Sequence, residues 1–453
     1  MCAILPMLEQ HAETALLERV CELIPQSLAD ALKMRPEDFT RTRKLPFPRL
    51  ITAVLSLVAN GQPHGVDTHL GVFFRTARRS GMWPDAIPPT RSAISKARRK
   101  VPWSVFRDIL DDAVALAYEV WPDDPQYSWN GLSVFAIDGS KYTLPASDDL
   151  RLEFDPDSGL DTPGKGHYPQ CLVSTLYDVF RRLPVARTVV GVNGSERDEA
   201  EQLLPYLPSN SVVVFDRGYP SYDFFRYLGE TDINFFLVRC PASCTFPAVE
   251  AFVASGLADA EIHLTPAKKA RERTPRHLRA QLPILHLRAV RLTAPDGTVS
   301  VLLTNMHDQQ RFSTADIVSI YFRRWGIEGY YRDEKITLDI ERFHATTSNG
   351  IRQELFAVMS MSVISRILMM RAARQHRASQ RHCQFTNAIL TLSAEAALLT
   401  HCDPQGAVIV FREILRELAR VVYSPPRTPR ASQPRMNKHP PNTWSLRNRS
   451  ATT

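Results

Sequence analysis

Cysteine is scarce in this chain of 453 residues. The seven cysteines are scattered, and Cys240 and Cys244 lack a second Cys or His pair at zinc-site spacing. This pattern excludes a disulfide framework and argues against a structural zinc. The chain has no unbroken apolar run of the roughly 18 residues that a membrane helix needs. It also lacks the basic start of a secretory signal. We therefore expect a cytosolic protein with no membrane partner.

Acidic residues are scarce in three segments, although the formal charge of the whole chain is only +7. Residues 41–100 hold twelve Lys and Arg against two Asp, residues 264–281 hold six against one Glu, and the last thirty residues hold six and no acid. Three basic blocks on an otherwise acidic chain indicate several contacts with one long polyanion. Any single block is equally compatible with ordinary solvated surface.

The hydrophobic pattern changes along the chain and predicts an α/β protein with added helical regions. Strand-like and helical segments after residue 130 follow the order β-β-β-α-β-α-β. The signal Asp296-Gly297 predicts a hairpin in the segment that follows, and one long helix is expected over Thr314–Ile336. The predicted regions are a helical DNA-binding domain over 1–125, a catalytic core over 126–240, a β-rich insertion over 241–305, the second part of the core over 306–370, a helical C-terminal region over 371–423 and a disordered basic tail over 424–453.

Two aspartates follow apolar strands. Asp138 comes after Val-Phe-Ala-Ile, and Asp216 comes after Val-Val-Val-Phe. Acids at strand ends tend to emerge at one edge of a sheet, where α/β active sites form. Each aspartate alone could instead form a turn before glycine.

A third acid lies in the predicted long helix. Tyr321, Arg324, Glu328 and Lys335 fall within roughly 60° of one helical face at about 100° per residue, so one carboxylate, two cations and a phenol share a stripe. Surface ion pairs could also produce this pattern. We expect the nearby acids to be solvated surface; these are Asp148, Asp149, Asp333 and Glu334.

The three acids suit phosphoryl transfer on DNA. Two Mg²⁺ ions roughly 3.5–4 Å apart can stabilise the attacking and leaving oxygens, and Mg²⁺ prefers carboxylate oxygens. We therefore predict that Asp138, Asp216 and Glu328 are both catalytic residues and ligands of two Mg²⁺ ions, with Mn²⁺ able to substitute. Tyr321, Arg324 and Lys335 are expected to contact the DNA strand, the two cations through its phosphates.

A short basic helix is predicted after Thr90, which is a suitable N-cap. It could lie along DNA phosphates or in a groove, or be an ordinary exposed helix. Its candidate DNA contacts are Arg91, Lys96, Arg98 and Arg99.

These motifs resemble those of a known family, the DDE transposases of insertion sequence family four. Ile137-Asp138-Gly139-Ser140 is similar to the first acidic motif and Phe215-Asp216-Arg217-Gly218-Tyr219 to the second. Leu303-Thr304-Asn305 matches the strand before the third motif, and the spacing from Tyr321 to Lys335 matches the Tyr-Arg-Glu-Lys signature without a gap. The resemblance covers about residues 40–370.

The resemblance implies an RNase H-like mixed sheet flanked by helices and interrupted by a β-rich insertion. It also implies binding to terminal inverted repeats and target DNA, a homodimer in the paired-end complex, and cut-and-paste transposition. Two alternatives share the acids: a metal-dependent DNA endonuclease, and an inactive or domesticated copy that only binds DNA. A glycosidase with paired carboxylates accounts for neither the basic blocks nor the stripe of cations.

Overall fold

The structure is a computed structural model of the full chain. It describes residues 4–24, 33–39, 45–61, 65–157, 168–231, 235–243, 246–294, 296–375, 382–400 and 404–423. The predicted disordered tail at 424–453 and the basic residues 41–44 therefore lie outside the described part of the chain.

The centre of the fold is one eight-stranded sheet with the strand order β3-β2-β1-β4-β5-β8-β7-β6. Strands β1, β4 and β5 run parallel to one another, and the remaining neighbours are antiparallel. The strands are β1 Ser133–Thr143, β2 Gln170–Asp178, β3 Leu183–Gly191, β4 Ser211–Phe215, β5 Phe235–Pro241, β6 Asp259–Leu264, β7 Leu285–Thr293 and β8 Val299–Thr304.

The first five strands in chain order form the RNase H-like arrangement, with three antiparallel strands followed by two parallel ones. This confirms the predicted fold class. Strands β6 to β8 come from the β-rich segment after residue 241 and extend the same sheet beyond β5. The hairpin predicted at Asp296-Gly297 joins β7 to β8, and Gly297 takes the positive φ of 82° that such a turn requires.

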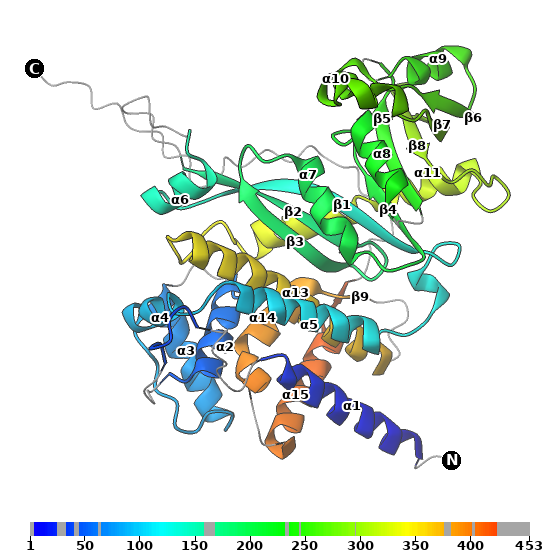
Figure 1. The fold of residues 1–453 in the computed structure, drawn as a ribbon. Coiled ribbons are helices and arrows are strands. Elements are labelled where there is room, and N and C mark those ends of the chain that lie inside the picture. Colours follow the sequence, from blue (N-terminus) through cyan, green and yellow to red (C-terminus); the bar gives the residue numbers. More distant parts are fainter. Residues whose placement is uncertain are drawn as a thin grey trace, which may run out of the picture.

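Each face of the sheet is covered by its own hydrophobic cluster because successive side chains of a strand point to opposite sides. On β1, Val134 and Ala136 belong to one cluster, whereas Phe135 and Ile137 belong to the other. Helix α7 (Glu196–Leu203) lies on the second face, and helices α5 (Ser104–Val120) and α13 (Ser348–Gln375) lie on the first (Figure 1). Helices therefore cover both faces of this part of the sheet.

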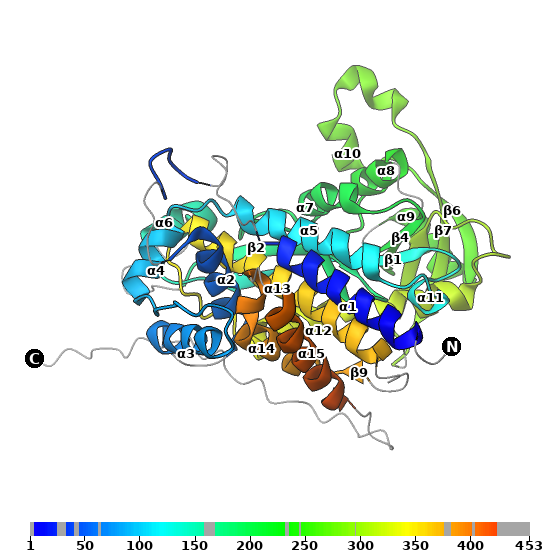
Figure 2. The same ribbon diagram turned by 90° about the horizontal axis from the view of Figure 1, so that it is seen from below.

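Helices from both ends of the chain pack beside α5 and α13, so the predicted helical N-terminal and C-terminal regions form one layer (Figure 2). Its N-terminal members are α1 Ile4–Glu22, α2 Phe47–Val58, α3 Val66–Arg79 and α4 Arg91–Arg98, and its C-terminal members are α14 Phe385–Ala394, the 3₁₀ helix Ala396–Thr400 and α15 Pro404–Arg420. Thr90 caps α4 as predicted, since its hydroxyl accepts from the backbone N–H of Ala93 at 3.3 Å. A two-stranded ribbon joins β9 His382–Cys383 to β10 Val422–Tyr423.

The remaining short elements border the sheet. They are α6 Asp148–Phe154, α8 Tyr222–Glu230, α9 Pro247–Ser255 and α10 Lys268–Arg273, with 3₁₀ helices at Pro125–Tyr127, Leu204–Tyr206 and Arg276–Gln281. Helix α13 is long and apolar enough to cross a membrane by length and composition, although the sequence contains no unbroken apolar run of that length. However, 89% of its most apolar stretch is buried inside the protein, as in a core helix.

The helix predicted over Thr314–Ile336 is not continuous. It consists of α11 (Thr314–Arg323), a tight turn at Arg324 and Trp325, α12 (Gly326–Arg332) and a π-helical segment at Asp333–Thr337. At the turn the backbone N–H of Arg324 donates to Tyr321 and that of Ile327 donates to Arg324, both three residues back. A Cβ at Gly326 would lie 3.3 Å from the Tyr177 ring, so glycine lets the chain bend against β2.

Candidate active site

The two aspartates lie level with each other on neighbouring parallel strands. β1 pairs with β4 up to Ala136 opposite Val214, so the same register continued places Asp138 opposite Asp216. β4 ends at Phe215, whereas β1 continues to Thr143, five residues beyond Asp138. The expectation that both acids meet at one edge of the sheet is consistent with this register, although Asp138 lies within its strand and not at its end.

Arg324 connects Asp138 to the third predicted acid. Its guanidinium donates to a Glu328 oxygen at 2.7 Å and approaches an Asp138 oxygen at 3.5 Å. The Arg324 side chain is only 7% exposed, while that of Glu328 is 54% exposed. Helix α12 thus brings Glu328 to the strand that carries Asp138, with one guanidinium between the two carboxylates.

The environment of Asp138 disfavours its charge. Burial raises the pKa of this carboxyl, Arg324 lowers it, and the negative charges of Asp216 and Glu196 raise it again, to about 7. A carboxyl whose pKa is shifted by burial and by two nearby acids is a candidate for a functional site.

The helical segment is fixed to β1 by two further side chains. The Tyr331 hydroxyl donates to the carbonyl oxygen of Asp138 at 2.7 Å, and the Lys335 ammonium donates to the Ser140 hydroxyl at 2.8 Å. Lys335 also lies over the Tyr142 ring. Tyr321 is 1% exposed and belongs to the core, so its side chain does not face solvent. Of the four signature residues, Glu328 alone keeps most of its side chain accessible.

The expectation that Glu334 lies on the solvated surface is wrong. It is fully buried in the π-helical segment and pairs with Arg187 of β3 at 2.8 Å, also fully buried. The hydroxyls of Tyr142 and Tyr330 donate to the same carboxylate. Asp333 is half-buried beside Arg366, whereas Asp148 and Asp149 are exposed as expected. A buried charge with this many partners has a structural role.

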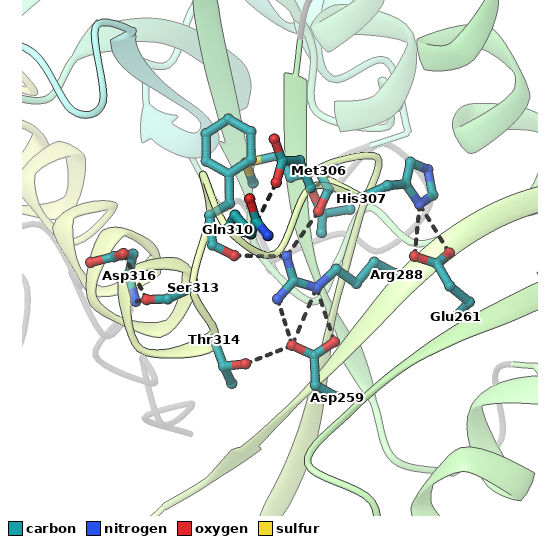
Figure 3. A network of polar contacts seen from close by, with 12 residues as sticks. Asp259, Glu261, Arg288, Met306, His307, Gln310, Ser313, Thr314 and Asp316 are labelled. Carbon is teal, nitrogen blue, oxygen red and sulfur yellow. Dashed lines mark hydrogen bonds and ion pairs between the residues drawn. The ribbon is translucent and has the colours of Figure 1, made fainter.

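The N-terminal end of α11 is anchored to strands β6 and β7 through a buried arginine (Figure 3). Arg288 of β7 is fully buried and pairs with Asp259 of β6, and it donates to the carbonyl oxygens of Met306 and Phe312 at 3.0 and 2.8 Å. The Thr314 hydroxyl donates to the same Asp259 carboxylate at 2.6 Å. Strands β6 and β7 therefore hold the beginning of the helix that leads to Glu328.

The donor set suits a hard divalent cation, because all three predicted ligands are carboxylates with no His or Cys beside them. Glycines flank both aspartates, and a Cβ at Gly218 would lie 3.1 Å from an Asp216 oxygen, so the backbone leaves room around that carboxylate. Among the described residues, no three acidic, His or Cys side chains already converge on one point. Arg324 currently lies between Asp138 and Glu328 and would have to release them for a shared ion.

The predicted DNA contacts of helix α4 divide into two groups. Arg91, Lys96 and Arg99 are exposed. Arg98 is buried and donates to Glu354 at 2.8 Å and to Gln353 at 3.1 Å, both on α13. Although burial raises the pKa of Glu354, Arg98 and His344 lower it to about 2. Arg98 is therefore committed to the protein interior and is not available to a phosphate in this structure.

One acid near the site was missed by the sequence analysis. Glu196, the first residue of α7, lies close enough to Asp138 to affect its pKa. The acids that begin this helix have an ordinary explanation, since negative charge is favoured at a helix N-terminus. Only the fold shows that this terminus lies beside the two aspartates.

An RNase H-like sheet with one acid within β1 and another directly after β4, and a third on a helix docked against β1, defines a class of phosphoryl-transfer proteins that act on nucleic acids. A family model described as the transposase DDE domain matches residues 129–364. The chain belongs to this family, the DDE transposases, and is of the insertion sequence family four type. The site residues inside the matched range include all three acids.

Two known proteins illustrate the similarity. Transposase InsG for insertion sequence element IS4 of Escherichia coli (strain K12) is 23% identical over 359 residues, which cover 78% of this chain and 75% of InsG. A solved structure of piggyBac transposase, a synaptic complex with hairpin DNA, aligns with a TM-score of 0.44 at 11% identity, covering 94% of this chain and 87% of that one.

Proposed function

We propose that the protein is the transposase of a bacterial insertion sequence, which binds terminal inverted repeats, cleaves the element's ends and joins them to target DNA. The observation that carries the proposal is the level placement of Asp138 and Asp216 on adjacent parallel strands, with Glu328 linked to Asp138 through Arg324. Asp138, Asp216 and Glu328 would hold two divalent ions, Mg²⁺ or Mn²⁺. The ions would supply an activated water or 3′-hydroxyl and neutralise charge on the phosphate.

The residues of this chain supply the positioning. Tyr331 and Lys335 hold the Glu328 helix on β1, and the bend at Gly326 directs the helix toward Asp138. Arg324, once it leaves the two acids, would be placed to contact a phosphate of the bound strand. We also propose that the helical region 1–125 contacts the DNA ends and that a homodimer forms the paired-end complex.

The test is incubation of the purified protein with Mg²⁺ or Mn²⁺ and DNA carrying the element's own ends. We expect nicking at the element boundary followed by strand transfer into a second DNA. Cleavage without joining would indicate an endonuclease, and specific binding without cleavage would indicate an inactive copy that acts as a DNA-binding protein. Cleavage that persists in Glu328→Ala would contradict the site.

A pH dependence follows from the raised pKa of Asp138. Between the pKa of about 4 of an ordinary aspartate and about 7 in the folded state, the folded protein binds a proton that the unfolded chain releases. Stability contributed by this group is therefore lost as the pH rises through that window, by up to about 1.4 kcal/mol per pH unit. Denaturant unfolding in EDTA should show this slope for the natural protein.

The control for this titration is Asp138→Asn, which cannot ionise but keeps the shape of the side chain. Its stability should fall less than that of the natural protein between pH 4 and 7. Equal slopes would show that Asp138 titrates at its ordinary pKa. Arg324, Asp216, Glu196, Tyr219 and Tyr331 surround the carboxyl, so these residues are kept unchanged in both proteins.

Neighbouring arginines of α4 should respond differently to replacement. Arg99→Ala removes an exposed charge, and we expect weaker DNA binding, a salt dependence reduced by about one phosphate contact and unchanged stability. Arg98→Ala leaves the buried Glu354 without its cation, and should cost about 3–5 kcal/mol of stability. Fluorescence anisotropy across a salt series and denaturant unfolding measure the two effects. Equal loss of DNA affinity in both folded variants would contradict this assignment.

A further inference from the structure

The N-terminus of helix α7 lies beside both aspartate motifs. Ser195 caps the helix by accepting from the backbone N–H of Asp198, and α7 packs across β1, β2 and β3. Arg197, the second residue of α7, donates to the carbonyl oxygens of Tyr219 and Gly218 at 3.0 and 2.9 Å. The first turn of α7 is thus tied to the segment that follows Asp216.

Gly139 leaves the space that the Glu196 carboxylate occupies, and Gly218 lies beside that carboxylate. A Cβ at Gly139 would lie 2.8 Å from the carboxyl carbon of Glu196 and 3.0 Å from one of its oxygens. A Cβ at Gly218 would lie 3.8 Å from the other oxygen. A Cβ at Gly139 would therefore push the Glu196 carboxylate out of its present position, so the glycine directly after Asp138 lets this carboxylate come close. The carboxylate therefore lies between the residues that follow the two aspartates.

This placement is unfavourable for the protein alone. Burial and the charge of Asp216 raise the pKa of Glu196, and Lys141 and Arg197 lower it only from a distance. Within the described part of the chain, no hydrogen-bond donor or ion-pair partner contacts the Glu196 carboxylate. An acid stabilises a helix N-terminus, but an acid directed toward solvent would give the same stabilisation without approaching two other carboxylates.

A second, independent feature points to a ligand at the same place. Tyr219 is fully buried, and its hydroxyl has no hydrogen-bond partner. Burial and then the charges of Glu196 and Asp138 raise the pKa of this hydroxyl, so it lies near both acids. Buried hydroxyls are nearly always satisfied, whereas this one lies near Glu196 and Asp138 without a hydrogen-bond partner.

We infer that Glu196 is a fourth metal-ligating carboxylate of this site, which joins Asp138 and Asp216 in holding a divalent cation with oxygen ligands. The inference rests on the proposed function, because the cation is the one that the transposition reaction would use. It differs from the three-acid site in that the additional ligand comes from the helix after β3, a part of the chain outside all three motifs. Gly139 then allows that ligand to approach the Asp138 motif.

The experiment compares Glu196→Gln with Asp198→Asn, an exposed acid of the same helical turn. Unfolding in EDTA and titration with Mn²⁺ alone, by calorimetry and by the Mn²⁺-induced rise in Tm, are measured on the full-length protein. We expect Glu196→Gln to raise the Tm in EDTA, because repulsion is removed. The same variant should weaken Mn²⁺ binding at least about tenfold, while Asp198→Asn changes neither quantity.

A merely structural role predicts the opposite sign, with a lower Tm in EDTA and unchanged Mn²⁺ affinity, and that result would overturn the inference. Glu196→Asp, which shortens the side chain by one methylene, should lie between the natural protein and Glu196→Gln in Mn²⁺ affinity. The variant Asp138→Asn distinguishes failure of the fourth ligand from failure of the whole metal site. If Asp138→Asn weakens Mn²⁺ binding and Glu196→Gln does not, only the fourth ligand is rejected. If neither changes Mn²⁺ binding, the metal site of the proposed function is rejected as well.

Discussion

Conversion of Asp138, Asp216 or Glu328 to the corresponding amide is expected to abolish cleavage and strand transfer while DNA binding persists. An amide keeps the size of the side chain but removes the charge that would hold the ions. Because residues that merely orient metal ligands cost 10–100-fold when lost, replacing a ligand itself should reduce the rate by more than about 100-fold. Gel assays of nicking and joining on end DNA, with anisotropy for binding, measure the two activities separately.

The matched control is Asp148→Asn, which removes an exposed acid at the start of α6. It should cleave at the natural rate. The three site variants should also remain inactive when Mn²⁺ replaces Mg²⁺, since no carboxylate is restored. An Asp216→Asn protein that cut at the natural rate would show that the level placement of the two aspartates has no part in catalysis.

Disruption of the Arg187–Glu334 pair should have the largest effect on stability. Both side chains are fully buried, so Arg187→Met leaves a carboxylate in the core with only Tyr142 and Tyr330 as donors. Removing one partner of such a pair typically costs about 3–5 kcal/mol. Urea unfolding followed by circular dichroism is the measurement, and Glu334→Leu should show a loss of similar size.

The double variant Arg187→Met with Glu334→Leu distinguishes burial of an unpaired charge from loss of packing. It should be more stable than either single variant, because no isolated charge remains. Additive losses would mean that the pair contributes through packing alone. Single variants within about 1 kcal/mol of the natural protein would show that the ionised pair is not a determinant of stability.

The two strands that carry the aspartates could be predicted because their signal is local. An apolar run followed by an acid specified β4, which ends at Phe215 directly before Asp216, whereas β1 continues past Asp138 to Thr143 because its pairing with β2 extends that far. The spacing from Tyr321 to Lys335 likewise predicted a helical stripe. The break at Gly326 was not predicted, because it depends on the close approach of the Tyr177 ring from a strand distant in sequence.

Charge burial could not be predicted for the same reason. Arg98 and Arg99 are neighbours in one basic run, yet Glu354, more than 250 residues away, draws only Arg98 into the core. Glu334 shows the same effect through Arg187. Glu196 resembled an ordinary acid at a helix start, and its proximity to Asp138 depends on how α7 crosses the sheet. Periodicity describes one element at a time, whereas these roles belong to pairs of elements.

The width of the sheet also sets the reach of helix α11. Helix α11 begins beside β6 and β7, where Thr314 donates to Asp259, and four neighbour-to-neighbour steps separate β7 from β1, which is about 19 Å at the usual strand spacing. The ten residues of α11 rise about 15 Å, so the helix alone falls short of that interval and the long Arg324 side chain completes the contact with Asp138. A chain that lost one helical turn of α11 without losing a strand would leave this guanidinium out of reach of the first aspartate.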